Sequence, residues 1–140
     1  MNRIIILMLF VLVFSWPALA NERFALVCDI ERTFNLIDGT LSGPSGNSTF
    51  VFEENEKKLE LKKLSGFRCD KIVKYQATEF DILIECESRL SDELKELSSI
   101  EINRFSGNFS VIFTTWKDRI RVDGGGVIQS GICTKKSKLF

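Results

Sequence analysis

The residues of this sequence that could do chemistry are few, and none of them is histidine. The chain has 140 residues with four Cys, no His, 19 acidic and 19 basic side chains. Without an imidazole, a Ser, Cys or Thr nucleophile lacks its usual general base, and a metal site lacks its commonest nitrogen ligand. We therefore expect neither nucleophilic catalysis nor a metal centre.

Carboxylate pairs are the remaining candidates for acid–base chemistry. Asp81 with Glu85, and Glu85 with Glu87, fall at alternating positions of a predicted strand, where such side chains usually form the solvated face. The glycines of 39–46 and 124–126 lack the spacing or the lysine of a nucleotide-binding loop. The balanced charge also gives no basic footprint for nucleic acid. The sequence thus predicts a protein that is not an enzyme, with no catalytic residue and no cofactor.

The first twenty residues have the form of an export signal. Arg3 precedes an apolar run of eleven residues, 4–14, and Ala18-Leu19-Ala20 supplies the small residues of a cleavage site. Because a membrane helix needs roughly 20 apolar residues, an uncleaved anchor is the less favoured alternative. We expect a signal peptide over 1–20 and a single β domain over 21–140, periplasmic or extracellular, with no stable membrane span after cleavage.

Export makes disulfide bonds the expected use of the cysteines. Cys28, Cys69, Cys86 and Cys133 are too widely spaced for a C-x-x-C metal or redox motif. Apolar alternation around the segment 76–79 predicts a hairpin with a turn centred on 77–78, and its register places Cys69 opposite Cys86. Cys28 and Cys133 are then left in the first and last predicted strands, where a bond between them would close a barrel.

Two further hairpins are expected from matched faces. A turn centred on 55–56 would place Phe52 opposite Leu59 and Phe50 opposite Leu61. A four-residue loop over 105–108 would place Ile102 opposite Val111 and Ile100 opposite Phe113, with Gly107 available for positive φ.

The other segments complete an all-β fold. Phe24, Leu26, Cys28 and Ile30 alternate as a first strand, a Gly/Ser-rich loop covers 38–48, and a last strand covers 127–134. Only 91–98 has a helical pattern, with Ser91 as its cap. We predict an antiparallel meander of about eight or nine short strands, forming a small barrel or sandwich, with one short helix near 91–98.

With these elements in place, the chain resembles a loose class of small exported bacterial proteins whose function is uncharacterised. The likeness rests on Cys28, on the segment 102–107 with the sequence INRFSG, and on Gly131-Ile132-Cys133 running to Phe140. It implies a compact β domain and carries over no catalytic or binding residue. The size and the disulfide-tied β architecture also resemble periplasmic inhibitors of c-type lysozyme, although the inhibitory Ser/Gly/Tyr loop motif of that family has no match here.

Charge is distributed unevenly along the chain. Segment 79–101 has eight acidic and two basic residues, whereas 117–140 has six basic and two acidic. The two segments would neutralise each other if their strands were neighbours. Alternatively, the acidic segment would meet a cationic protein, and the basic residues would form an anionic-ligand patch. The patch residues are Lys117, Arg119, Arg121, Lys135, Lys136 and Lys138.

Three functions therefore remain open at the level of sequence. The favoured one is an exported, non-catalytic binding module that recognises a protein or a cell-envelope component. The alternatives are a small barrel that carries a lipophilic ligand and an inhibitor of a cationic enzyme such as lysozyme. The 12 Phe residues favour a filled interior over a ligand cavity.

Overall fold

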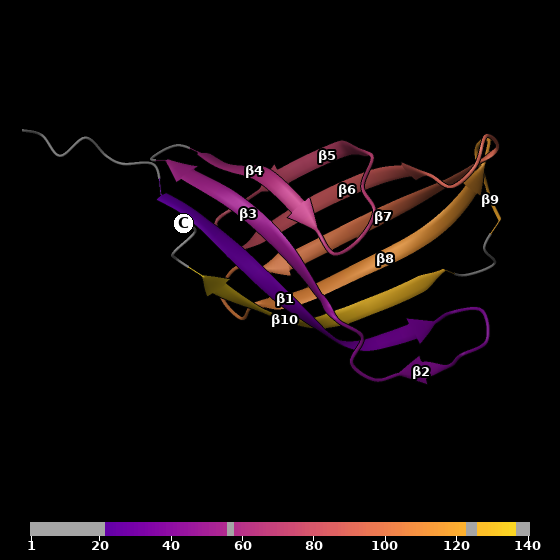
Figure 1. Ribbon diagram of the computed structural model, residues 1–140, viewed down its shortest axis with the longest axis horizontal. Coiled ribbons are helices and arrows are strands. Elements are labelled where there is room, and N and C mark those ends of the chain that lie inside the picture. The colour runs from indigo at the N-terminus through magenta and orange to yellow at the C-terminus, as the bar shows by residue number, and fades with distance from the viewer. Residues whose placement is uncertain (1–21, 56–57, 123–125, 137–140) are drawn as a thin grey trace, which may run out of the picture.

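The chain forms one antiparallel sheet that curls into a nearly closed barrel (Figure 1). The computed structural model describes residues 22–55, 58–122 and 126–136. The predicted signal peptide, the hairpin tip at 56–57, most of the turn at 123–126 and Lys138 lie outside these residues. The strands are β1 (Glu22–Asn35), β2 (Leu41–Ser42), β3 (Asn47–Asn55), β4 (Lys58–Ser65), β5 (Lys71–Ala77), β6 (Asp81–Arg89), β7 (Leu94–Asn103), β8 (Asn108–Lys117), β9 (Ile120–Arg121) and β10 (Val127–Lys136).

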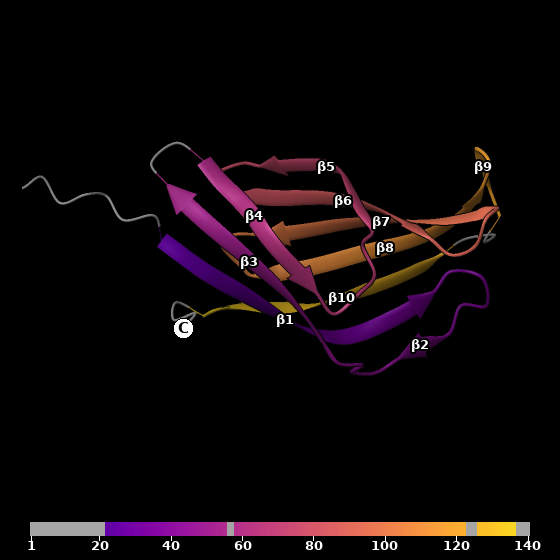
Figure 2. The same ribbon diagram turned by 45° about the horizontal axis from the view of Figure 1, so that its top comes forward.

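The long strands form the wall in the order β4-β3-β1-β10-β8-β7-β6-β5, with the short β2 and β9 attached to β1 and β8. The last strand pairs with the first, as the closure prediction required, and the all-β barrel is confirmed. The order begins at β4 and ends at β5, so the wall has one seam between two strands that follow each other in sequence. Figure 2 shows the same arrangement from a second angle.

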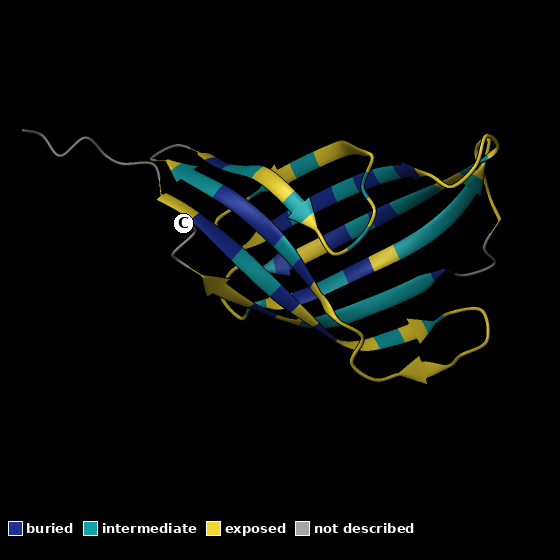
Figure 3. Ribbon diagram, in the orientation of Figure 1, coloured by how far each residue is buried: buried dark blue, intermediate teal, exposed yellow. Residues whose placement is uncertain are grey.

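The barrel interior is filled by large apolar side chains. The first strand alternates as expected, with Phe24, Cys28 and Ile30 buried. The ring of Phe50 lies 6.0 Å from that of Phe109 on the far wall and 5.9 Å from that of Phe67, which reaches in from the loop between β4 and β5. Figure 3 shows buried residues along the middle of the strands and exposed ones on β2 and the tips.

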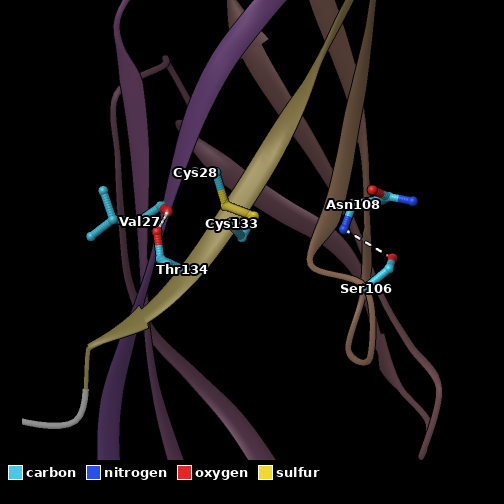
Figure 4. The surroundings of a disulfide bond; sticks show 6 residues. All are labelled: Val27, Cys28, Ser106, Asn108, Cys133 and Thr134. Carbon is cyan, nitrogen blue, oxygen red and sulfur yellow. Dashed lines mark hydrogen bonds between the residues drawn. A yellow bond between two sulfur atoms is a disulfide. The ribbon is translucent and has the colours of Figure 1, made fainter.

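Both predicted disulfides are confirmed. Cys28 and Cys133 face each other directly in the β1–β10 ladder, with Cα atoms 3.8 Å apart (Figure 4). Beside them, the Thr134 hydroxyl donates to the Val27 carbonyl at 3.5 Å. Cys69 lies in the loop before β5 and bonds to Cys86 of β6. Two intramolecular disulfides indicate a chain that folds in an oxidising environment.

The predicted hairpins exist, but their registers were wrong. In the β5–β6 hairpin Tyr75 faces Ile84, not Phe80, and Ile72, not Cys69, is the ladder partner of Cys86. The β3–β4 hairpin pairs Phe52 with Leu61 rather than with Leu59. In each hairpin the side chains stay on the face expected for them, because each strand has shifted by an even number of residues.

The third hairpin shows the same kind of shift. Ile102 faces Phe109 and Ile100 faces Val111, because the four-residue loop spans 104–107 instead of 105–108.

The expected helix over 91–98 is absent: Leu94–Asn103 is strand β7. The Ser91 hydroxyl does accept hydrogen bonds from the backbone N–H groups of Glu93 and Leu94, at 3.3 and 3.1 Å. These bonds close a turn and are followed by a strand, since β7 pairs along its length with β6 and β8. A hydroxyl that caps a helix and one that closes a turn make the same local contacts, so tertiary pairing decided the outcome.

Candidate functional site

The most prominent hollow of the described chain lies where the β6–β7 and β8–β9 turns meet. It has a volume of about 530 Å³. We call it the Trp116 groove, and it is lined by Glu87, Asp92, Glu93, Lys95, Glu96, Leu97, Trp116, Asp118 and Arg119. Its walls thus contain five acidic and two basic side chains. An aromatic ring surrounded by carboxylates is a setting that attracts organic cations.

The ladder registers explain why these side chains gather on one face. Trp116 is the partner of Lys95 in the β7–β8 ladder, and Leu97 is the partner of Glu87 in the β6–β7 ladder. Opposed residues of an antiparallel pair point to the same side of the sheet. Because Ser98 and Ile100 are buried inside the barrel, the odd-numbered positions of β7 face outward, and the groove opens on the outer face of the wall.

Trp116 is held in a fixed position. Its indole N–H donates to the Thr114 hydroxyl at 2.8 Å, and that hydroxyl donates to the Leu97 carbonyl at 3.3 Å. The indole donor is thus satisfied within the protein, and the ring is the part that a ligand can contact. A ring that is already positioned loses little side-chain entropy when it binds.

Internal ion pairs neutralise part of the groove. Lys95 pairs with Glu87 at 3.0 Å, and Lys117 pairs with Glu93. Asp92 and Asp118 are exposed and make no ion pair within the described ranges. The groove therefore keeps a net negative charge after its internal pairs are counted.

Glu96 differs from the other carboxylates of the groove. It faces the buried Ser88 across the β6–β7 ladder, and burial raises the pKa of its carboxyl, while Arg68 opposes that shift. A basic group bound nearby would favour its charged form.

The structure separates the residues of the predicted anionic-ligand patch into two groups. Lys117, Arg119 and Arg121 lie at the end of β8, in the turn and on β9, beside the Trp116 groove. Lys135 and Lys136 lie at the opposite end of the barrel, where β10 finishes (Figure 1). Lys135 pairs with Glu22 at 3.0 Å and lies over the Phe24 ring.

The other end of the barrel is occupied by a structural arginine. Arg104, in the β7–β8 loop, donates to the Thr78 carbonyl at 2.8 Å and to Glu54 at 3.0 Å, so it ties three hairpin tips together. Next to it, the exposed rings of Phe80 and Phe105 lie 5.6 Å apart.

Sequence reasoning identified the acidic segment and missed Trp116. A usable signal was present, because the chain has two tryptophans, of which Trp16 lies in the predicted signal peptide. A single tryptophan in a small exported domain would have been worth singling out as a binding residue, since tryptophan is enriched at binding hot spots.

Three findings concern the wider class of the protein. Within the described ranges no three Cys, Asp or Glu residues come together as a metal site. In the same ranges no helix is long and apolar enough to cross a membrane. Comparison with protein-family models, with curated proteins and with solved structures found no match.

Proposed function

We propose that this protein is an exported, non-catalytic binding module that recognises a basic segment of a partner protein through the Trp116 groove. The observation that carries the proposal is the gathering of Trp116, Leu97 and five carboxylates around one hollow of about 530 Å³. The two disulfides support a periplasmic or extracellular location.

The chemistry of recognition follows from the lining. A lysine or arginine of the partner would place its charge over the Trp116 ring and within reach of Asp92 or Asp118, while its aliphatic stem would contact Leu97. Such a cation–π contact contributes about 0.5 to 2 kcal/mol, depending on how far it is shielded from water. Several basic residues in the partner are therefore needed for tight binding, which favours a polypeptide over a single small cation.

The two other functions left open by the sequence have less support. A lipophilic carrier needs a cavity, whereas the rings of Phe50, Phe67 and Phe109 meet in the barrel interior. An anionic envelope component would need a continuous basic patch, whereas Lys117 and Lys135 lie at opposite ends of the barrel and are each paired with a glutamate. An inhibitor of a cationic enzyme such as lysozyme is compatible with the groove and is one form of the proposed function.

Fluorescence provides a direct test. In a chain that begins at Asn21, Trp116 is the only tryptophan, so a bound cation should change its emission. We expect an oligo-arginine peptide and c-type lysozyme to bind with a Kd that rises steeply with salt concentration.

The matched variants separate the groove from general negative charge. Asp92→Asn with Asp118→Asn should weaken binding by at least about tenfold, and Asn tolerates the positive φ of 48° at position 118. Glu79→Gln with Glu101→Gln removes the same charge from exposed sites outside the groove and should change the Kd by less than about twofold. Equal losses in the two double variants, or binding that is unaffected by Trp116→Phe, would refute the proposal.

A further inference from the structure

The seam between β4 and β5 is where the barrel wall lacks a backbone ladder in the described chain. The sheet order ends at these two strands, and no pairing joins them. Figures 1 and 2 both show β4 and β5 close together at one end and spreading apart toward the other. An edge strand directs every second backbone N–H and C=O group away from its own ladder. The seam therefore has two rims with unused hydrogen-bonding groups.

An apolar side chain lies uncovered in this seam. Ile72 is the ladder partner of Cys86, which is fully buried, so Ile72 points toward the interior side of the wall. It is nevertheless 43% exposed. An inward-facing isoleucine with that exposure lacks the neighbour that an adjacent strand would supply.

Two shallow grooves follow the seam and share residues. One, of about 340 Å³, is lined by the continuous run 61–64 of β4 together with Cys69, Asp70 and Ile72. The other, of about 300 Å³, includes Leu61, Ile72 and Tyr75. Four successive β4 residues along one groove show that the strand offers its edge, and not merely one face, to the seam.

The seam is held open by contacts at both ends. At the narrow end the Tyr75 hydroxyl donates to the Leu59 carbonyl at 2.8 Å. At the wide end the Cys69–Cys86 disulfide ties the connecting loop to β6, away from β4. The rims are thus positioned before any partner arrives.

Positive charge dominates both rims. The two strands contain five lysines, Lys58, Lys62, Lys63, Lys71 and Lys74, and one acidic residue, Glu60. Lys62 and Lys58 hydrogen-bond to Glu60 and lower the pKa of its carboxyl to about 2, and Lys74 pairs with Glu85. Within the described ranges Lys63 and Lys71 make no ion pair, so the seam attracts a negatively charged occupant.

We propose that the seam binds an extended, acidic segment of a partner protein, which adds to the sheet as a strand along the free edge of β4. Its backbone pairs with residues 61–64, one of its apolar side chains covers Ile72, and its carboxylates meet Lys63 and Lys71. A second copy of this chain is a poor occupant, because pairing two β4 edges would bring lysines against lysines. This surface is separate from the Trp116 groove and opposite in charge.

Hydrogen exchange with a model peptide tests the proposal. The probe is a short capped peptide of alternating Glu and Val, added to the folded, disulfide-intact protein. Binding should slow amide exchange within 61–64 of β4 and leave β10 unchanged. Unchanged exchange in β4 at saturating peptide, or a concentration-dependent dimer of the protein alone that protects β4, would overturn it.

Two controls separate strand pairing from charge attraction. Lys63→Glu should weaken peptide binding by at least about tenfold at low salt, while Lys136→Glu, an exposed site on β10, should leave it within about twofold. The same peptide with alternate backbone nitrogens methylated keeps its carboxylates but cannot complete the ladder, and it should lose binding. If the methylated peptide binds as tightly as the parent, the seam is only a charged surface and the strand model is wrong.

Discussion

Removing each disulfide in turn tests how the barrel is held together. The two variants are Cys28→Ala with Cys133→Ala, and Cys69→Ala with Cys86→Ala. Each removes two sulfur atoms, and in each pair one partner is fully buried, so the cavity costs are similar. The difference in stability should then report mainly the chain lengths that the bonds close.

Those lengths give the expected magnitudes. The Cys28–Cys133 bond spans a sequence separation of 105 residues, and the Cys69–Cys86 bond spans 17. In the chain-entropy model these loops correspond to about 4.8 and about 3.1 kcal/mol at 25 °C, a difference of about 1.6 kcal/mol. Both are upper values, because residual structure in the unfolded chain reduces them.

Urea unfolding followed by tryptophan fluorescence and by circular dichroism measures the difference. Both variants should still fold, since β1 and β10 keep their ladder and β6 keeps its pairing with β5 and β7. The Cys28/Cys133 variant should have the lower midpoint. If the Cys69/Cys86 variant is the less stable of the two at equal m-values, loop length does not control the ranking, and native contacts of the 66–70 loop do.

Three further substitutions test single contacts. Gly131→Ala should cost at least about 2 kcal/mol in urea unfolding, because a Cβ there would lie 1.8 Å from a backbone oxygen of β1; Gly43→Ala, with nothing within 4 Å, should be neutral, and equal costs would contradict the close approach. Ser98→Ala should leave stability unchanged or raise it by up to about 1 kcal/mol, since the buried hydroxyl makes no hydrogen bond to the described chain; a clear loss in thermal unfolding would reveal an undescribed partner. Tyr75 is the only tyrosine, and burial raises its pKa to about 12, so the folded chain holds the phenol proton more tightly than the unfolded chain. The stability from this difference is complete below about pH 10 and is lost as the pH rises toward 12; absorbance titration at alkaline pH measures it, and Tyr75→Phe should remove that pH dependence, so an unaltered slope would disprove the assignment.

The candidate site shows what sequence could and could not predict about function. The acidic run in 79–101 is visible in the sequence, and several of its carboxylates line the Trp116 groove. The groove itself depends on the β8–β9 turn folding beside the β6–β7 turn, and that placement comes from ladder registers that sequence left undetermined. The same registers put Lys117 against Glu93, which reduced the expected basic patch at this end.

The three hairpins show why alternation predicted faces but not partners. When one strand slides by two residues against its neighbour, every side chain meets a new partner on the same face, so the hydrophobic pattern is equally satisfied. The turns decide between such registers. The Thr78 hydroxyl accepts from the backbone N–H groups of Phe80 and Asp81, and the Asn103 side-chain oxygen accepts from those of Phe105 and Ser106.

These side-chain bonds fix where each strand ends, and they also explain the correct disulfide. In the β5–β6 hairpin the turn moves Ile72 into the place predicted for Cys69, and Cys69 falls in the loop just before β5. The loop brings Cys69 back to Cys86, with Cα atoms 5.3 Å apart, within the usual range for a disulfide. A pairing between cysteines is therefore less sensitive to register than a ladder is, because a flexible connection can reach a partner that a strand cannot.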